Sequence, residues 1–273
     1  LRSSGDMTLT AGSQVDVSSG AALDAKGQLT GGKGGDLTLA ANANSGDSRG
    51  SLALDGELLG YGVNGGGRLS VQAGQVLISD SAVAPGTGTL QLGSGFFNKG
   101  FGAYVITGNE GLVVADGTQL AVTTPVYRLN DNAQSVASGA APRTALEIWT
   151  PPQYQENPTK GLLTPRKGAS MSLQAGTLLS TAAQMASAQL RIGQGARIEV
   201  DPGQAISLRS IGQLTVDGSL NAWGGSITLG AVSVQPNVAD GVENQGHGRS
   251  IWIGEHAVLD VAGRAFTAVD SLG

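Results

Sequence analysis

The amino-acid sequence predicts an all-β chain folded as a parallel β-helix, a solenoid built from short stacked strands. Three observations lead to this prediction. Glycine accounts for 44 of the 273 residues, whereas aromatic residues make up 4% and charged residues only 14%, against about 25% charged residues in ordinary domains. Short segments of one type recur along most of the chain. Within them apolar and polar residues alternate with a period of two, which is typical of half-buried strands.

The first recurring segment consists of a glycine, a variable residue and an apolar–polar–apolar triplet. Helical spacing explains none of its copies. They occur at Gly5–Leu9, Gly35–Leu39, Gly50–Leu54, Gly67–Val71, Gly88–Leu92 and Gly225–Leu229, and looser copies occur at Met171–Leu173, Leu190–Ile192, Ile206–Leu208 and Ile251–Ile253.

The second recurring segment ends in Asp-Gly, with a further apolar residue close behind. Glycine turns a corner with positive φ at no steric cost, and an aspartate in such a turn can hydrogen-bond the local backbone. We therefore expect Asp55, Asp116 and Asp217 to hold turns rather than to catalyse a reaction or bind calcium. The segments are Leu52–Leu58, Val113–Leu120 and Leu214–Leu220, with relatives at Val15–Val17, Ile198–Gly203 and Val258–Val261.

Each such strand presents only about two apolar side chains inward, so it must stack on copies of itself to form a core. The step from Ile206 to Ile227 is 21 residues. Such a step has room for three short strands and tight turns, which makes one coil of a triangular parallel β-helix. Inward Leu, Ile and Val side chains would then form columns along the axis, with Val216 and Leu229 among them.

Two interruptions divide the chain into β-helix coils over residues 1–122, a proline-rich insert over 123–168 and further coils of the same solenoid over 169–273. The first interruption is an aromatic loop over residues 95–104. Its rings either form an exposed contact patch for a sugar or a protein, or pack inside the coil or cap it. The loop contains Phe96, Phe97, Phe101 and Tyr104.

The insert contains six of the nine prolines. Proline at this density cannot sit in a central ladder, so we expect an extruded loop lying against the rod, with a short hairpin around Ala145–Thr150. The insert either binds a partner or covers coil edges, and its Tyr127, Trp149 and Tyr154 join the aromatic loop as candidate partner contacts. Ala182–Leu190 is expected to form either a turn or two of helix or an alanine-rich strand. Gln235–Gly248, with His247 near Glu243, is expected to form a loop.

Composition argues against several classes of function. The absence of cysteine excludes disulfides and thiolate metal sites. A net charge of −5 without a Lys/Arg cluster argues against a nucleic-acid partner, and no apolar run reaches the roughly 18 residues of a membrane-spanning helix. Because Leu1–Gly5 has no signal-peptide character, we interpret the chain as a monomeric fragment from inside a longer protein.

The residues also predict no catalytic residue, no metal and no cofactor. Strand carboxylates are spread along the chain at Asp6, Asp16, Asp36, Glu199 and Asp260. The two histidines, His247 and His256, lack ligand partners at metal-binding spacing. The glycine-rich stretches Gly31–Gly35 and Gly65–Gly67 open no helix and are interpreted as turns rather than phosphate cradles.

Three segments resemble the coils of filamentous-haemagglutinin-like exoproteins, which are exported by two-partner secretion. They are Gly5–Gly12, Ala22–Gly27 and Gly35–Ala41, and the likeness covers most of the chain outside the insert. The aromatic loop and the insert look like an uncharacterised C-proximal region of some family members. The resemblance implies a right-handed parallel β-helix that passes through an outer-membrane β-barrel transporter and is secreted or displayed at the bacterial cell surface. It carries over no catalytic residue.

The function predicted from these observations is that of a structural and adhesive stalk segment in a large adhesin. The resemblance implies a role in adhesion, biofilm formation or virulence, with a host or bacterial surface protein or glycan as partner. Two alternatives remain open. One is a β-helical carbohydrate-active enzyme, in which carboxylates of neighbouring coils would converge on one face. The other is a presentation rod for a C-terminal toxin in contact-dependent inhibition.

Overall fold

Short strands are the main secondary structure of the described residues, and the all-β prediction is confirmed. The computed structural model describes residues 1–24, 26–41, 50–137, 139–157, 162–177, 180, 187–232 and 249–265. Among these, the named helical elements are the 3-10 helices η1 (Ser94–Asn98) and η2 (Ala133–Ser135) and the four-residue α1 (Pro142–Ala145). The expected loop at Gln235–Gly248, with His247, and most of Ala182–Leu190 lie outside the described residues.

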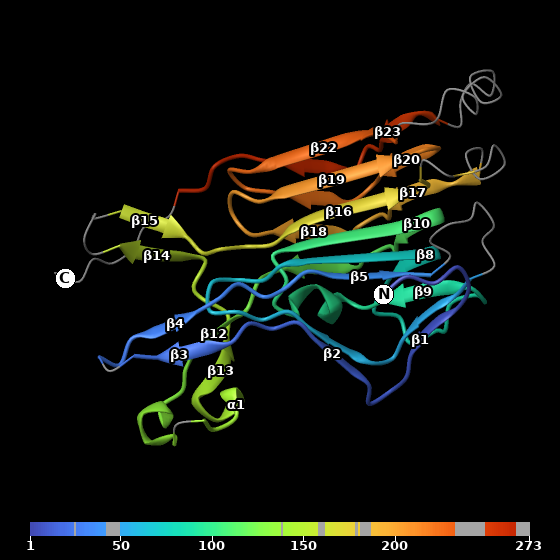
Figure 1. Ribbon diagram of the computed structural model, residues 1–273. Helices are drawn as coiled ribbons and strands as arrows, with labels where there is room; N and C mark the ends of the chain where they lie inside the picture. Colours follow the sequence, from blue (N-terminus) through green and yellow to red (C-terminus); the bar gives the residue numbers. More distant parts are fainter. Residues whose placement is uncertain are drawn as a thin grey trace.

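Strands from distant parts of the sequence stack in parallel (Figure 1). The first stack contains β5, the first half of β8, the first half of β10, β16, β19 and β22, each paired in parallel with the next. Their bounds are β5 (Leu37–Ala40), β8 (Arg68–Ile78), β10 (Ala103–Val114), β16 (Ser170–Ala175), β19 (Ala205–Ser210) and β22 (Ser226–Ala231).

The second stack shares the long strands β8 and β10 with the first. Their second halves pair with β9 (Thr89–Leu92), with each other and with β17 (Gln189–Ile192), followed by β20 (Gln213–Val216) and β23 (Ile251–Ile253). The register shifts between Gly108 and Gly111, where β10 passes from one stack to the other. A Cβ on Gly108 would lie 2.0 Å from the Gly111 carbonyl oxygen. The chain therefore requires glycine at this bend.

The third stack contains β11 (Gln119–Val122), β18 (Arg197–Val200), β21 (Ser219–Asn221) and β24 (Val258–Asp260), all parallel. Near the N-terminus, β1 (Met7–Leu9) pairs in parallel with β6 (Leu52–Leu54), and β2 (Gln14–Asp16) pairs in parallel with β7 (Glu57–Leu59). From β16 to β24 the chain visits the first, second and third stacks in that order three times. One such passage is called a coil below.

The core is built from columns of apolar side chains that stand in register along each stack. Most of the side chains are fully buried, because the next coil covers them, whereas Leu229, Ile253 and Leu259 at the end of the stacks are more exposed. In the first stack, one column consists of Leu39, Val71, Ile106, Leu173, Leu208 and Leu229. In the second stack, one column consists of Ile78, Val114, Ile192, Val216 and Ile253. In the third stack, one column consists of Leu120, Ile198, Leu220 and Leu259.

Three antiparallel hairpins depart from the stacks. Two lie within the predicted insert: β12 (Val126–Leu129) pairs with β13 (Leu146–Trp149), and β14 (Tyr154–Asn157) pairs with β15 (Leu162–Pro165). The short hairpin expected around Ala145–Thr150 is wrong, because this stretch forms a single strand, β13, whose partner β12 lies at Val126–Leu129.

The third hairpin corrects the prediction that Ala22–Gly27 belongs to a coil. Here β3 (Ala21–Leu23) pairs antiparallel with β4 (Leu29–Gly31). Asp24 Oδ1 accepts hydrogen bonds from the N–H groups of Lys26 and Gln28, and Gly27 has a φ of 75°. Aspartate and a left-handed glycine close a tight turn, so this segment reverses direction instead of continuing along a stack.

Replacing Val216 with aspartate is expected to lower the free energy of unfolding more than the same change at Leu229. Val216 is fully buried between Ile192 and Ile253, whereas Leu229 is only partly buried. An unpaired buried charge costs about 3–5 kcal/mol. Urea denaturation followed by circular dichroism measures the loss. Thr215→Asp, on the outward side of the same strand, is the control, and an equal loss at Thr215 and Val216 would contradict the inward position of Val216.

Candidate functional site

Aspartates at the ends of strands bind the backbone of a neighbouring part of the stack. Each accepts, through Oδ1, the N–H of a residue that directly follows a glycine. The pairs are Asp6 with Ser51 at 2.7 Å, Asp36 with Arg68 at 2.7 Å, Asp80 with Ser94 at 2.7 Å and Asp116 with Gln194 at 3.0 Å. For Asp116 the expectation of a local turn bond is therefore wrong, because its carboxylate reaches the next coil.

The glycines of these pairs give the carboxylates room. A Cβ on Gly193 would lie 2.2 Å from Asp116 Oδ1, and a Cβ on Gly67 would lie 2.6 Å from Asp36 Oδ1. At Asp6, hydrogen bonds from the N–H and the hydroxyl of Ser51 lower the pKa of the carboxyl group, because they stabilise its charged form. The recurring glycine therefore leaves space for the aspartate carboxylate of the neighbouring strand.

The other strand carboxylates also have nearby partners. Asp16 accepts the N–H of Ser18, Glu199 pairs with Arg197, and Asp260 accepts the N–H of Ala262. His256 lies 3.5 Å from Glu255. Within the described part of the chain, no group of three or more His, Cys, Asp or Glu side chains is placed to hold a metal ion.

The aromatic loop fills a gap in the third stack. The helix η1 lies between β7 and β11, because the Gly60 N–H donates to the Lys99 carbonyl at 2.9 Å and the Thr123 N–H donates to the Phe97 carbonyl at 3.2 Å. Phe97, Phe101 and Tyr104 are fully buried. These three rings pack inside the coil, so the alternative of an exposed contact patch is wrong for them.

The buried rings hold one another and the loop in place. Phe97 and Phe101 lie edge-on to Tyr104, with ring centroids 5.4 and 6.0 Å away. The Tyr104 hydroxyl accepts the Lys99 N–H at 3.0 Å, and burial raises the pKa of this hydroxyl. Phe96 differs from the other three because it is only partly buried. It packs against Phe97 at 5.4 Å and also faces a pocket.

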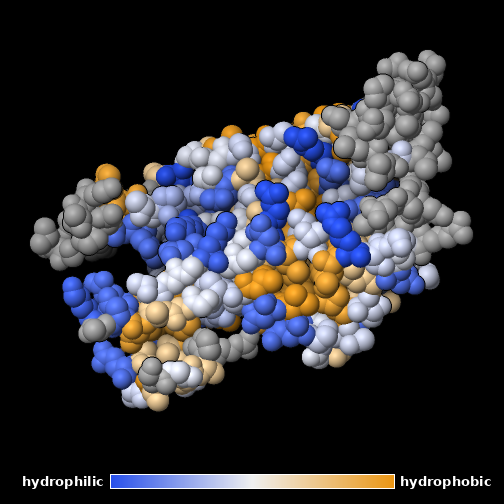
Figure 2. All heavy atoms as spheres, viewed as in Figure 1, coloured by the Kyte–Doolittle hydropathy of each residue, from blue (hydrophilic) through white to orange (hydrophobic). Residues whose placement is uncertain are grey.

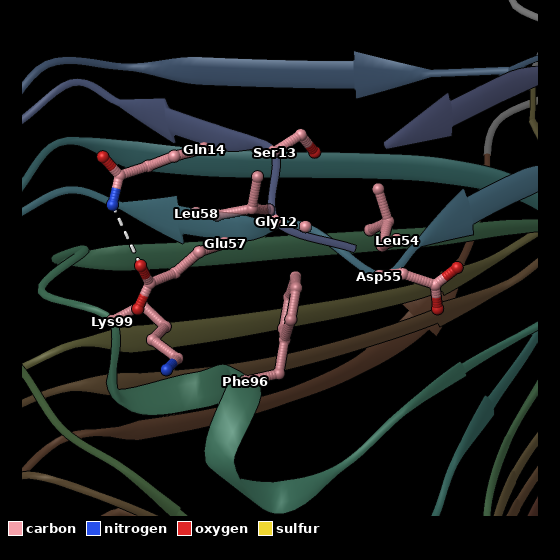
Figure 3. Close-up of a pocket in the computed structure, with 10 residues that line it drawn as sticks. Gly12, Ser13, Gln14, Leu54, Asp55, Glu57, Leu58, Phe96 and Lys99 are labelled. Carbon is pink, nitrogen blue, oxygen red and sulfur yellow. Dashed lines mark hydrogen bonds between the residues drawn. The ribbon is translucent and has the colours of Figure 1, made fainter. Parts of the chain in front are cut away.

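This pocket has a volume of about 530 Å³ and lies between β2, β7 and η1 (Figure 3). Phe96 rises from η1 between Lys99 on one side and Asp55 on the other. Gln14 Nε2 donates to Glu57 Oε2 at 2.9 Å on the rim. The remaining lining residues are Gly12, Ser13, Leu54, Gly56 and Leu58. The sequence pointed to Phe96 but not to the pocket, because the walls of the pocket come from three segments that are distant in the sequence.

One wall of the pocket is an unpaired strand edge. The Glu57 N–H donates to the Ser13 carbonyl and the Leu59 carbonyl accepts the Val17 N–H, so these peptide groups of β7 face β2. Alternate residues of a parallel strand bond to opposite sides. The N–H and carbonyl of Leu58 therefore face η1 and the pocket.

The aromatic residues of the insert lie apart from η1. Tyr127 is buried, with its ring 5.7 Å from that of Tyr61, and together with Leu59 and Leu146 it joins β12–β13 to the stack. Trp149 is partly buried under the Arg128 guanidinium, 4.9 Å from the ring centroid. Tyr154 lies on β14, in the other hairpin. The seven candidate contact residues therefore do not form one site.

A buried ion pair fastens the β14–β15 hairpin to the stack. Arg166 donates through Nε and a terminal nitrogen to Asp201 Oδ1, and through its other terminal nitrogen to the Pro151 carbonyl at 2.7 Å. The Asp201 side chain is 2% exposed. Burial raises the pKa of Asp201, and Arg166 only partly opposes this effect. The pair thus joins both ends of the hairpin to the corner after β18.

Neither a scan against protein-family models nor searches of curated proteins and of solved structures find a match to this chain. The resemblance to filamentous-haemagglutinin-like exoproteins therefore remains a prediction from the sequence. No helix among the described residues is long and apolar enough to cross a membrane.

Gly193→Ala is expected to lower the free energy of unfolding by about 1–3 kcal/mol, the usual cost of overpacking. The new methyl group would meet both the side chain and the backbone of Asp116. Thermal unfolding measures the change. Gly230→Ala is the matched control, because a Cβ on Gly230 meets no atom within 4 Å. Equal effects of the two substitutions would show that the close approach at Gly193 is unimportant.

Asp201 is expected to make stability depend on pH in the opposite direction from a carboxylate whose pKa is lowered on folding, such as Asp6. Burial raises the pKa of Asp201 in the folded chain above its ordinary value, so the folded chain binds more protons between the two pKa values. Its contribution to stability is greatest below the ordinary aspartate pKa and is lost as the pH rises through the folded-state pKa. Denaturation at several pH values, compared with Asp201→Asn, measures this. A contribution that grows with pH would contradict the raised pKa.

Proposed function

We propose that the chain is a segment of a right-handed parallel β-helix that forms a rigid, adhesive stalk of a large secreted bacterial surface protein. The observation that carries the proposal is the repeated passage through three parallel stacks in a fixed order, with apolar columns in register. The connection from β16 to β19 runs through β17 and β18. Crossovers between parallel strands of one sheet are right-handed in about 98% of cases, which supports the proposed hand.

A stalk needs to be stiff and extendable, and this architecture supplies both properties. Each coil contacts its neighbours through strand ladders and apolar columns, so adding coils lengthens the rod without enlarging its cross-section. The carboxylates of Asp6, Asp36 and Asp116 bind backbone N–H groups of neighbouring segments. Because these carboxylates already bind backbone N–H groups, they favour a structural role for the chain over a catalytic one.

The adhesive part of the proposal is supported by surfaces that project from the stacks. The hairpins β3–β4 and β12–β13 enclose a hollow of about 430 Å³ lined mainly by alanine and leucine. Figure 2 shows hydrophobic atoms over these hairpins. Exposed apolar patches mark interaction sites. Secretion through an outer-membrane transporter and cell-surface display are proposed from the family resemblance and from the absence of cysteine.

Beads coated with the folded chain are expected to attach to epithelial or bacterial cells several-fold more than beads coated with the Val216→Asp variant, whose stack is disrupted. Attachment is counted by microscopy at equal coating density. Equal attachment of the two bead types, or none above uncoated beads, would contradict the adhesive role. A variant in which a short glycine-serine link replaces residues 125–165 tests the insert separately. Unchanged attachment of that variant assigns binding to the stalk.

The proposed hand has its own test. A crystal structure of the chain shows the direction of the crossover from β16 to β19 directly. A left-handed crossover would overturn the right-handed β-helix while leaving the parallel stacks intact.

A further inference from the structure

The pocket between β7 and η1 combines a partly exposed aromatic ring, a polar rim and an unpaired strand edge. We infer that this pocket binds a neutral saccharide, with one face of a pyranose ring against Phe96. This inference rests on the proposed adhesive function and gives it a ligand class.

Phe96 is suited to act as a stacking platform because it is held rigidly but not fully covered. Its ring packs edge-on against Phe97, with centroids 5.4 Å apart, and lies 6.4 Å from Tyr104. The buried neighbours fix its orientation, so binding costs little conformational entropy. One face of a pyranose carries C–H groups, whose positive edges complement the negative face of an aromatic ring. Leu54 and Leu58 extend the apolar wall.

The rim can satisfy the hydroxyl groups of a sugar, each of which both donates and accepts hydrogen bonds. Glu57 is held by Gln14 through Oε2, which leaves Oε1 as an acceptor. Figure 3 shows Glu57 and Lys99 on the same side of Phe96, so an acceptor and a donor lie beside the ring, whereas the Asp55 carboxylate points away from it. The Leu58 peptide group adds a backbone donor and acceptor. Two carboxylates and one ammonium group in the lining disfavour an anionic ligand.

The size of the pocket and the position of η1 favour a sugar over an extended peptide. A volume of about 530 Å³ is ordinary for a small-molecule site, which typically measures about 300–1,000 Å³. A peptide added to the edge of β7 would need a strand position about 4.8 Å away. The backbone of η1 already occupies that position at one end, where the Gly60 N–H bonds to the Lys99 carbonyl.

Saturation-transfer difference NMR on the full 273-residue chain tests the inference with glucose, galactose, mannose and N-acetylglucosamine as probes, and with an unstructured hexapeptide as the competing class. We expect at least one sugar to receive saturation, strongest at the C–H protons of one ring face. Phe96→Ala should reduce the signal at least ten-fold, whereas Phe96→Tyr should retain it. Trp252→Ala, which removes an exposed ring on β23, is the matched control and should change nothing.

A second variant covers the possibility that Phe96→Ala disturbs the packing of Phe97. Glu57 is exposed, so Glu57→Ala should leave the melting temperature unchanged while weakening sugar binding several-fold. The inference is overturned if no sugar binds, if neither Phe96→Ala nor Glu57→Ala reduces binding, or if only the peptide receives saturation. Cell attachment of coated beads without sugar binding would refute this inference and leave the adhesive role standing. Sugar binding without cell attachment would refute the adhesive role and leave this inference standing.

Discussion

Register between neighbouring parallel strands is the constraint on which the rest of this structure depends. A strand of three to six residues contributes only two or three inward side chains, and each must meet an apolar partner directly above and below. A slip by one residue would turn Val216 outward and bring Thr215 into the column between Ile192 and Ile253. The ladders, the close approach at Gly193 and the position of η1 all require the same alignment.

The segments that interrupt the stacks show how this constraint is met where the repeat fails. In the third stack, η1 takes the place of a strand, and Phe97 and Phe101 fill the interior volume that inward aliphatic side chains would otherwise occupy. The insert leaves the stack after β11 and returns at β16, and just before this return the pair Arg166–Asp201 fixes both ends of the β14–β15 hairpin. Departures from the repeat are thus confined by strong local interactions, so the coils on either side remain aligned.

Much of the architecture could be predicted from the sequence because its periodicity is local. The alternation at Ile206–Leu208 and Leu214–Val216 identifies strands without any knowledge of their neighbours, and the 21-residue step from Ile206 to Ile227 indicates that they stack. The hairpin at Ala22–Gly27 was missed because its apolar residues match a coil, while Asp24 and Gly27 make a turn. The bond from Asp116 to Gln194 and the meeting of Gln14, Glu57 and Phe96 could not be predicted, because which residues become neighbours depends on how each coil aligns with the next.

Three of the aspartate bonds between coils point in one direction along the rod. In the pairs Asp6–Ser51, Asp36–Arg68 and Asp116–Gln194, the carboxylate belongs to the earlier coil and the N–H to the coil that stacks on it. Asp80 differs, because Ser94 follows β9, which lies on the opposite side of β8 from β10. At the three positions a completed coil presents a carboxylate acceptor before the next coil arrives. Each of these carboxylates helps to position the coil that follows, so a chain that emerges N-terminus first can fold in the order in which it appears.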